Sequence, residues 1–212
     1  NEYSGPTWYI TEGGNDTTAT GASSDPFRSI QAGINFSSDA DSVTVAAGTY
    51  VENINFRGRN IEVVGEDRET TIIDGNSAAA VVTFNNSEIS SALLSGFTIQ
   101  NGSGNEGGGI VCWETSPTLL DLLVTGNTAN YGGGILCRGD GENLNSPVID
   151  NVTIEGNYGA YGGGIGISYS DPQIQNVKVI NNSHSWGGGG IHIWLANPVL
   201  KNVLVADNWT MR

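Results

Sequence analysis

The chain has 212 residues, enough for one sizeable domain, and its 22 acidic and 8 basic side chains give a formal net charge of −14. So few basic residues cannot form a patch for nucleic acid, and the negative charge disfavours binding to an anionic membrane surface. No run of 18 apolar residues exists that could span a bilayer, and two cysteines are too few for a disulfide scaffold. The composition therefore predicts neither a nucleic-acid partner nor insertion into a membrane.

Residues 1–41 are predicted to form an N-terminal strand and a short capping helix. The strand is expected at 8–10, where Trp, Tyr and Ile follow one another. Asp25 can cap a helix whose first position is Pro26. Apolar residues then recur at helical spacing, namely Phe27, Ile30 and Ile34. We expect this helix to cover the N-terminal end of the structure that follows.

Residues 42–212 are predicted to form stacked coils of β-strands. Before residue 90 the strand patterns are irregular but continuous, at 42–50, 53–56, 61–64, 71–73 and 81–84. After residue 90 the sequence repeats. Gly-Gly-Gly-Ile begins at Gly107, Gly132 and Gly162, and a fourth copy from Gly187 carries one extra glycine. Other markers keep the same register: Pro117, Pro147, Pro172 and Pro198, and Asn127, Asn157, Asn182 and Asn208.

Within each repeat, apolar and polar residues alternate, which is the pattern of half-buried β-strands. Three short strands fit into one repeat: one after the proline, one after an intervening Asn or Asp, and one at the end of the glycine run. No helical period appears after residue 90. A repeat of about 25 residues with three strands predicts a parallel β-helix, in which each coil pairs with its neighbours at roughly 4.8 Å.

A polar residue recurs at the bend between the first and second strands of each coil. The positions are Gly96, Asp121, Asn151, Asn176 and Asn202, of which the first lacks a side chain. Asn tolerates left-handed backbone and bonds nearby backbone groups. We expect these side chains to stack as a structural asparagine ladder without a catalytic role.

The C-terminal repeat stops before a further glycine-rich strand. Its last strands should therefore leave apolar residues such as Val203 and Val205 uncovered, beside unpaired backbone groups that template association with another chain. We expect either that the β-helix continues beyond Arg212 or that a partner covers this end, end-to-end self-association included.

Residues 24–50, Asp74-Gly75-Asn76 and the later coils resemble the secreted right-handed parallel β-helix proteins of the pectin-lyase-like superfamily. Residues 124–135 are also similar to the repeats of chlamydial polymorphic outer-membrane proteins, which combine an Asn motif with Gly-Gly-Ala or Gly-Gly-Ile. The resemblance implies an all-β, right-handed solenoid of about six coils with a short N-terminal capping helix, and an extracellular or bacterial cell-surface location. The first five residues lack the basic and apolar regions of a signal peptide, as in an already processed chain.

By this resemblance, the strand after each glycine run belongs to the sheet that forms the substrate groove, and the segment before the run is a variable turn. Outward positions on that strand are Val111, Leu136, Gly166 and His192, followed by Trp113, Arg138, Ser168 and Trp194. Cys112 and Cys137 share one inward position in adjacent coils. Parallel side chains at that position favour buried free thiols over a disulfide.

Catalysis is disfavoured by the residues on this strand. Enzymes of the pectin-lyase-like group use clustered carboxylates with Ca²⁺ and a basic residue, or several Asp on neighbouring groove strands. At the outward positions of this strand, Arg138 is the only Lys or Arg, and no position carries Asp or Glu. The nearby acids are expected on solvated turns at the rim: Glu106, Glu114, Asp140 and Glu142.

Aromatic residues point to contact with a glycan. Three rings each precede a glycine run by one residue and are predicted to stack in consecutive coils: Tyr131, Tyr161 and Trp186. Further candidates lie along the same side: Trp113, Trp194, His192 and Arg138. Aromatic faces at the edge of a flat glycine floor suit the apolar face of a sugar ring. The alternative is a structural ladder of rings that pack only on one another.

The turn after Arg138 is longer than in the other repeats and carries Asp140, Glu142 and Asn143. Their oxygens could form a loose Ca²⁺ site. Apart from this calcium site, we expect no metal and no cofactor.

The sequence therefore favours a non-catalytic module of a secreted or surface-anchored bacterial protein, a rigid stalk or adhesin-like domain that touches a polysaccharide or cell-surface glycan. The alternative is a polysaccharide lyase or glycoside hydrolase of the pectin-lyase-like group. Because β-helices host both kinds of protein, the residues of the groove must decide between them.

Overall fold

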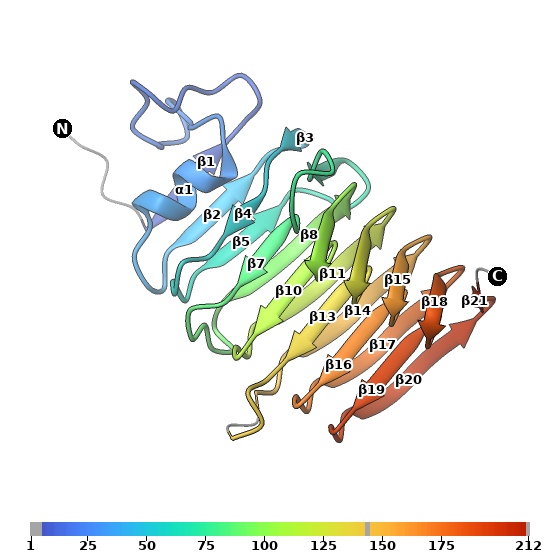
Figure 1. The fold of residues 1–212 in the computed structure, drawn as a ribbon. Helices are drawn as coiled ribbons and strands as arrows, with labels where there is room; N and C mark the ends of the chain where they lie inside the picture. The colour runs from blue at the N-terminus through green and yellow to red at the C-terminus, as the bar shows by residue number, and fades with distance from the viewer. Residues whose placement is uncertain (1–5, 143–144, 211–212) are drawn as a thin grey trace.

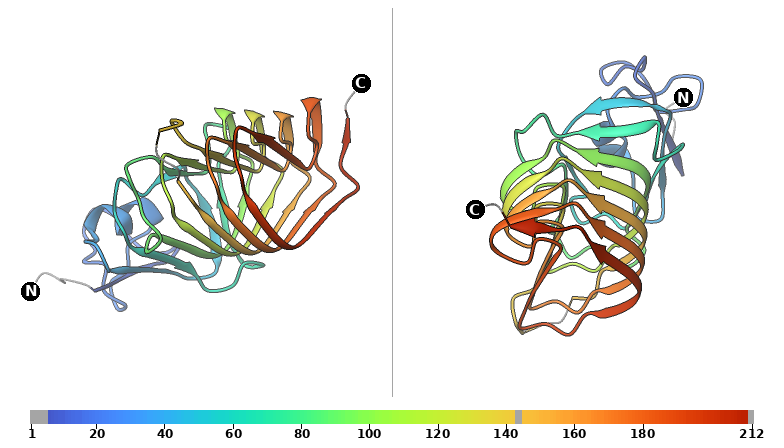
Figure 2. Two further views of the ribbon diagram at one scale, coloured as in Figure 1. Left: turned by 90° about the horizontal axis from the view of Figure 1, so that it is seen from below. Right: turned by 90° about the vertical axis from the view of Figure 1, so that its right-hand side faces the viewer.

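The protein is a right-handed parallel β-helix of about six coils with one short helix, as described by a computed structural model for residues 6–142 and 145–210 (Figure 1). The coils are stacked along one axis, with the helix at the N-terminal end and the last coil, drawn in red, at the other (Figure 2). The predicted fold class is confirmed. No helix among the described residues is long and apolar enough to cross a bilayer.

The strands of the described residues form three parallel sheets. The first sheet contains β1 (Thr7–Ile10), β2 (Ser42–Val45), β3 (Gly48–Val51), β5 (Glu62–Gly65), β6 (Thr71–Asp74), β8 (Leu93–Gln100), β11 (Thr118–Thr125), β14 (Val148–Glu155), β17 (Gln173–Ile180) and β20 (Val199–Ala206). The second sheet contains β4 (Ile54–Asn55), β7 (Val82–Phe84), β10 (Ile110–Trp113), β13 (Ile135–Arg138), β16 (Ile165–Ser168) and β19 (Ile191–Trp194). The third sheet contains β9 (Ser103–Glu106), β12 (Thr128–Tyr131), β15 (Tyr158–Tyr161), β18 (Ser183–Gly187) and β21 (Trp209–Thr210).

The core of the β-helix is built from the inward-facing residues of successive coils, which stack in register. Val124, Ile154 and Val179 occupy one such position and are 0% exposed. Because side chains alternate between the two faces of a strand, the polar residues between them face outward. The alternation seen in the sequence thus produces one continuous apolar interior that runs along the axis.

The two strands predicted at the start of each repeat are one strand of eight residues, bent in the middle. The bend falls at the fourth residue, where φ is 51° at Asp121, 54° at Asn151 and 53° at Asn176. Asn and Asp adopt this left-handed conformation more readily than other residues with side chains. The bend was therefore predicted at the right residues, but the strand does not end there: its pairing skips the bend residue and resumes one or two residues later.

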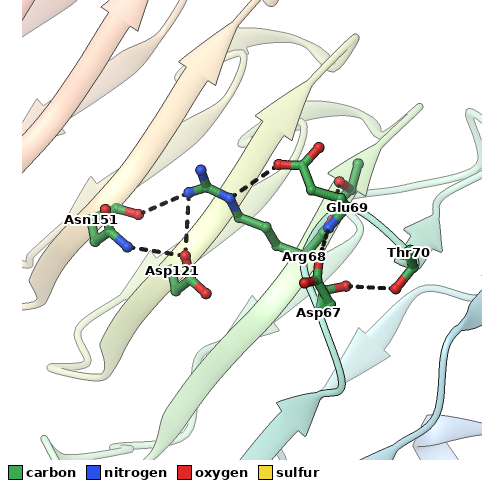
Figure 3. Close-up of polar contacts among 7 residues, drawn as sticks. Asp67, Arg68, Glu69, Thr70, Asp121 and Asn151 are labelled. Carbon is green, nitrogen blue, oxygen red and sulfur yellow. Dashed lines mark hydrogen bonds and ion pairs between the residues drawn. The ribbon is translucent and has the colours of Figure 1, made fainter.

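Side chains at the bends interact along the outer surface, as the sequence suggested. Asn151 donates a hydrogen bond to Asp121 (3.0 Å), and Asn202 donates one to Asn176 (2.8 Å). Gly96 supplies no side chain to this row. There Arg68, from the loop after β5, reaches Asp121 with a nitrogen–oxygen distance of 3.3 Å, as Figure 3 shows.

The buried asparagine ladder lies elsewhere, at the end of each eight-residue strand. Asn127 donates from both its backbone N–H and its Nδ2 to Oδ1 of Asn157, each at 3.0 Å, and Asn157 repeats the pattern with Asn182. Asn182 does the same with Asn208. The side chains of the first three are at most 1% exposed. The sequence marked this recurrence, but we had expected the ladder at the bends.

The segment before each glycine run is a strand, which corrects the expected variable turn. Residues 128–131 and 158–161 pair in parallel and belong to the third sheet. Each of these strands starts directly after a ladder asparagine, because the ladder satisfies the backbone groups of the turn and lets the next four residues extend. A third wall of the coil is formed in this way.

Helix α1 (Ile30–Phe36) covers the N-terminal end but begins later than predicted. Asp25 does not cap it, because its carboxylate accepts a hydrogen bond from the N–H of Thr20 (2.9 Å) in a preceding turn. Phe27 lies beside β1 and donates its N–H to the carbonyl of Tyr9. The N-cap is Ser29 instead, whose hydroxyl accepts a hydrogen bond from a backbone N–H of the first turn (3.2 Å).

Cys112 and Cys137 are both buried and both free, which confirms the predicted thiols. They are register partners on β10 and β13. A hydrogen bond with Cys137 and burial together raise the pKa of the Cys112 thiol well above its usual value.

The last coil is open to solvent along its inner face. Val205 is 50% exposed, whereas its register partner Val179 is 0% exposed, and Leu200 is 46% exposed beside the buried Ile174. The exposure expected for Val205 is therefore observed. End-to-end association through this surface stays a prediction.

The asparagine ladder can be tested by substitution. We expect Asn157→Ala to lower the free energy of unfolding by about 2–4 kcal/mol, because it leaves the buried N–H of Asn127 and the carbonyl of Val124 without partners. The matched control is Asn130→Ala, which removes an exposed amide and should change stability by less than about 0.5 kcal/mol. Denaturant titration followed by circular dichroism measures both. Equal effects of the two substitutions would contradict a structural ladder.

The thiols provide a second test. In the native protein we expect no reaction with Ellman's reagent, because both thiols are buried and the raised pKa of Cys112 keeps it protonated. In denaturant without a reducing agent, both cysteines of the chain should react. Failure to detect them in denaturant would indicate a disulfide.

Candidate functional site

A groove lies where the third sheet meets the second sheet, at the inside of the corner formed by the glycine runs. The first glycine of the first three runs has a positive φ, for example 62° at Gly132 and 71° at Gly162, and in the fourth run the second glycine, Gly188, takes this place with 66°. A Cβ atom at Gly132 would lie 2.5 Å from the carbonyl oxygen of Ile135, closer than real Cβ contacts allow. Glycine is therefore required for the chain to turn this sharply from one sheet into the next.

The groove has a volume of about 450 Å³. Its lining is drawn from four consecutive coils: Glu106, Tyr131, Leu136, Arg138, Tyr161, Gly166, Ile167, Ser168, Tyr169, His192 and Trp194. This volume falls within the roughly 300–1,000 Å³ of small-ligand pockets. Five of the seven residues predicted to contact a glycan therefore line one groove, and the other two, Trp113 and Trp186, do not.

Two outward residues of the second sheet are buried, although their position predicted exposure. Val111 is 6% exposed and Leu136 is 2% exposed. The glycine backbone folds back over them, and a Cβ atom at Gly107 would overlap Val111. Leu136 and Gly166 thus form an apolar floor, because the next outward position after Leu136 carries no side chain.

The rings of Tyr131 and Tyr161 stack as predicted, with centroids 5.2 Å apart and an angle of 10° between planes. Trp186 does not continue the stack. The extra glycine of the fourth run shifts the register, so that Tyr161 lies opposite Gly187. His192 takes that place from the second sheet, with its ring 5.3 Å from Tyr161 and tilted by 56°.

Stacking leaves few aromatic faces free to meet a ligand. Tyr131 and Tyr161 cover one another, and the guanidinium carbon of Arg138 lies 4.9 Å from the centre of the Trp113 ring. Trp194 lines the groove and is 57% exposed. Trp186 is 77% exposed but does not line the groove. Trp194 is accordingly the ring best placed to contact a sugar there.

Glu106 lies on strand β9 and lines the groove, which corrects its expected place on a rim turn. Its Oε1 accepts a hydrogen bond from Nη1 of Arg138 in an ion pair. Its other oxygen, Oε2, is buried and has no hydrogen-bond partner among the described residues. Glu106 precedes Gly107 just as Tyr131 precedes Gly132, so the sequence did contain a signal for its position.

The calcium candidates lie on the turn after β13. A carboxylate oxygen of Asp140 accepts a hydrogen bond from the N–H of Glu142 (2.8 Å). Asn143 lies outside the described residues. Within the described ranges, no group of three or more His, Cys, Asp or Glu side chains could hold a metal ion. Calcium binding at this turn stays a prediction.

A second hollow of about 350 Å³ lies beside helix α1, and its carboxylates serve the local fold. Glu52 accepts hydrogen bonds from the first two N–H groups of α1, at 2.8 and 3.0 Å. Glu12 accepts one from Thr49 (2.9 Å). Burial, with these two acids and Glu66 nearby, raises the pKa of Tyr50 to about 12. These acids hold turns in place, so we assign them no ligand.

Comparison with known proteins supports the fold. Residues 12–57 match a family model described as "Protein of unknown function (DUF1565)", a family associated with parallel β-helix proteins. The match covers less than a quarter of the chain and includes the hollow beside α1, but not the groove. No curated protein and no solved structure matches the chain.

The tyrosine stack can be separated from the free rings by stability measurements. We expect Tyr161→Ala to lower the free energy of unfolding by about 1–2 kcal/mol, because Tyr161 packs between Tyr131 and His192. Trp186→Ala removes a larger but exposed ring and should change stability by less than about 0.5 kcal/mol. Thermal and denaturant unfolding measure both. A larger loss for Trp186→Ala would contradict this assignment of the rings.

Proposed function

We propose that the protein is a non-catalytic β-helix module of a secreted or cell-surface bacterial protein, stalk-like or adhesin-like, that contacts a polysaccharide or cell-surface glycan through the groove. The observation that carries the proposal is the groove's combination of one open tryptophan face with hydroxyl and imidazole groups. Trp194 supplies the face, and Ser168 and His192 supply polar groups beside it. Sugars present one apolar face and a rim of hydroxyls, which such a lining complements.

The shape of the groove favours a chain over a compact ligand. The groove crosses four coils, and its lining residues occupy equivalent register positions in successive coils. These are Glu106, Tyr131 and Tyr161 in the third sheet, and Arg138, Ser168 and Trp194 in the second. Adjacent coils are separated by roughly 4.8 Å. A linear glycan can therefore lie along the helix axis and meet side chains from a new coil at successive sugar units.

The lining of the groove favours binding over bond cleavage. Glycoside hydrolysis commonly needs two carboxyl groups that flank the bond. Among the described residues that line the groove, Glu106 is the one carboxylate, and it forms an ion pair with Arg138. A lyase or hydrolase of the pectin-lyase-like group is the alternative, and it would need further acids from outside this lining.

The construction of the β-helix supports a stalk-like role. From β9 onward each coil shares backbone hydrogen bonds with the next along three sheets, and the asparagine ladder runs through the turn between two of them. Continuous ladders of this kind tie each coil to its neighbours in a fixed register, which suits an extended, rigid spacer. It can hold the groove at a fixed orientation.

Glycan binding can be tested with Trp194→Ala and Trp186→Ala. The two substitutions remove the same side chain from exposed positions, but only Trp194 lines the groove. We expect Trp194→Ala to weaken binding to soluble oligosaccharides by about tenfold, and Trp186→Ala to leave it within twofold, since an aromatic contact is worth about 1 kcal/mol. A glycan array identifies the oligosaccharide, and calorimetry measures its affinity.

Three results would contradict the proposal. Absence of binding to any glycan on the array would remove its basis. Equal losses for the two tryptophan substitutions would place the contact outside the groove. Release of products from uronic-acid or neutral polysaccharides, with or without Ca²⁺, would favour the enzymatic alternative.

A further inference from the structure

We propose that Glu106 determines which glycans the groove accepts, by neutralising Arg138 so that uncharged sugars are bound and uronates are not. This inference rests on the proposed function, because it concerns the ligand of the same groove. It assigns the ion pair to specificity, whereas the rings supply affinity.

The ion pair joins two adjacent coils across the groove wall. Glu106 ends strand β9, Arg138 ends strand β13, and Oε1 of the first accepts a hydrogen bond from Nη1 of the second. Their side chains are 22% and 34% exposed, so water screens the pair only in part. Oε2 of Glu106 has no hydrogen-bond partner among the described residues, so the contact of this carboxylate with a cation is the one that Oε1 makes with Arg138.

Neighbouring groups hold Arg138 in this arrangement. Its guanidinium lies over the Trp113 ring, with 4.9 Å between the guanidinium carbon and the ring centre. The indole N–H of Trp113 donates to Oε1 of Glu114 at 2.9 Å. The cation is thus held between the Trp113 ring and the carboxylate of Glu106, which balances its charge.

The charges around the groove leave an anionic ligand without a partner. Among the described lining residues, Glu106 and Arg138 are the one acid and the one Lys or Arg, and they cancel. Asp140 and Glu142 lie on the turn that follows Arg138, and the whole chain carries a formal charge of −14. A uronate would enter a negative field and find no free cation, whereas a neutral sugar would lose nothing.

Removal of the charge on Glu106 should therefore change which sugars are accepted. Without it, Arg138 has five N–H donors in a planar fork that matches the geometry of a carboxylate. Glu106→Gln keeps the size and shape of the side chain and removes only the charge. The variant should gain affinity for uronates while its contacts with neutral sugars remain.

The experiment compares an anionic sugar chain with its methyl-esterified form and with uncharged chains. The probes are hexagalacturonate, its fully methyl-esterified form, and neutral hexamers of glucan, mannan and xylan. Proteins to compare are the unsubstituted chain, Glu106→Gln, the double variant Glu106→Gln with Arg138→Gln, and Glu62→Gln. Glu62 is exposed on β5 of the first sheet, so its substitution makes the same change in net charge away from the groove.

For the unsubstituted protein we expect the methyl-esterified hexamer to bind at least about tenfold more tightly than hexagalacturonate. Glu106→Gln should improve the affinity for hexagalacturonate by at least about fivefold and change that for neutral hexamers by less than twofold. The gain should shrink in high salt and be absent from Glu62→Gln and from the double variant. Thermal unfolding verifies that each variant is folded.

The possible failures are distinguishable. If no probe binds any of the proteins, the proposed function is wrong, and the role of Glu106 falls with it. If neutral hexamers bind but the unsubstituted protein binds hexagalacturonate equally well, only the charge selection is wrong. If Glu106→Gln leaves the ratio of the two affinities unchanged, or the double variant keeps the gain, Glu106 does not act through Arg138.

Discussion

Every wall of this β-helix depends on the register with which one coil pairs with the next, and the buried asparagine ladder carries that register through the turn where the first sheet ends. Backbone ladders align residues within each sheet, but a turn has no ladder of its own. The side chain of Asn157 takes the place of a backbone ladder in this turn. Its amide nitrogen donates to Asn182, and its amide oxygen accepts from Asn127. The third sheet starts directly after these residues, and one wall of the groove with it.

The same dependence explains why one inserted residue changes the site. The fourth glycine run has an extra residue, and the pairing of β15 with β18 is displaced so that Tyr161 faces Gly187. Trp186 is thereby removed from the row of rings. His192, which lies on the second sheet, packs against Tyr161 instead. The row of rings, which runs along the third sheet from Tyr131 to Tyr161, therefore ends in a contact between two sheets.

The repeat in the sequence was sufficient to predict the fold, because alternation and spacing directly reflect burial and coil length. It was less informative at corners. The bend row of Asn151 and the ladder row of Asn157 recur at identical intervals, yet the bend row interacts on the outer surface and the ladder row is buried. The glycine backbone that folds over the second sheet likewise buries Leu136 on an outward face. Glu106 was misplaced for a different reason: its position before a glycine run was visible, but its chemical difference from Tyr131 suggested a solvated turn.

The groove is built from equivalent positions of successive coils, and most of its lining is distinct from the inward residues of the core. The inward residues of a coil hold the core, while the residue before a glycine run and the outward residues after it reach the groove. In the row that contains Glu106, Tyr131 and Tyr161, a carboxylate stands where the next two coils have rings, although the backbone pairing is the same. One position can therefore change the charge of the groove without altering the register beneath it. Because the carboxylate sits beside the lining's Arg138, this arrangement makes the groove electrically neutral within a strongly acidic protein.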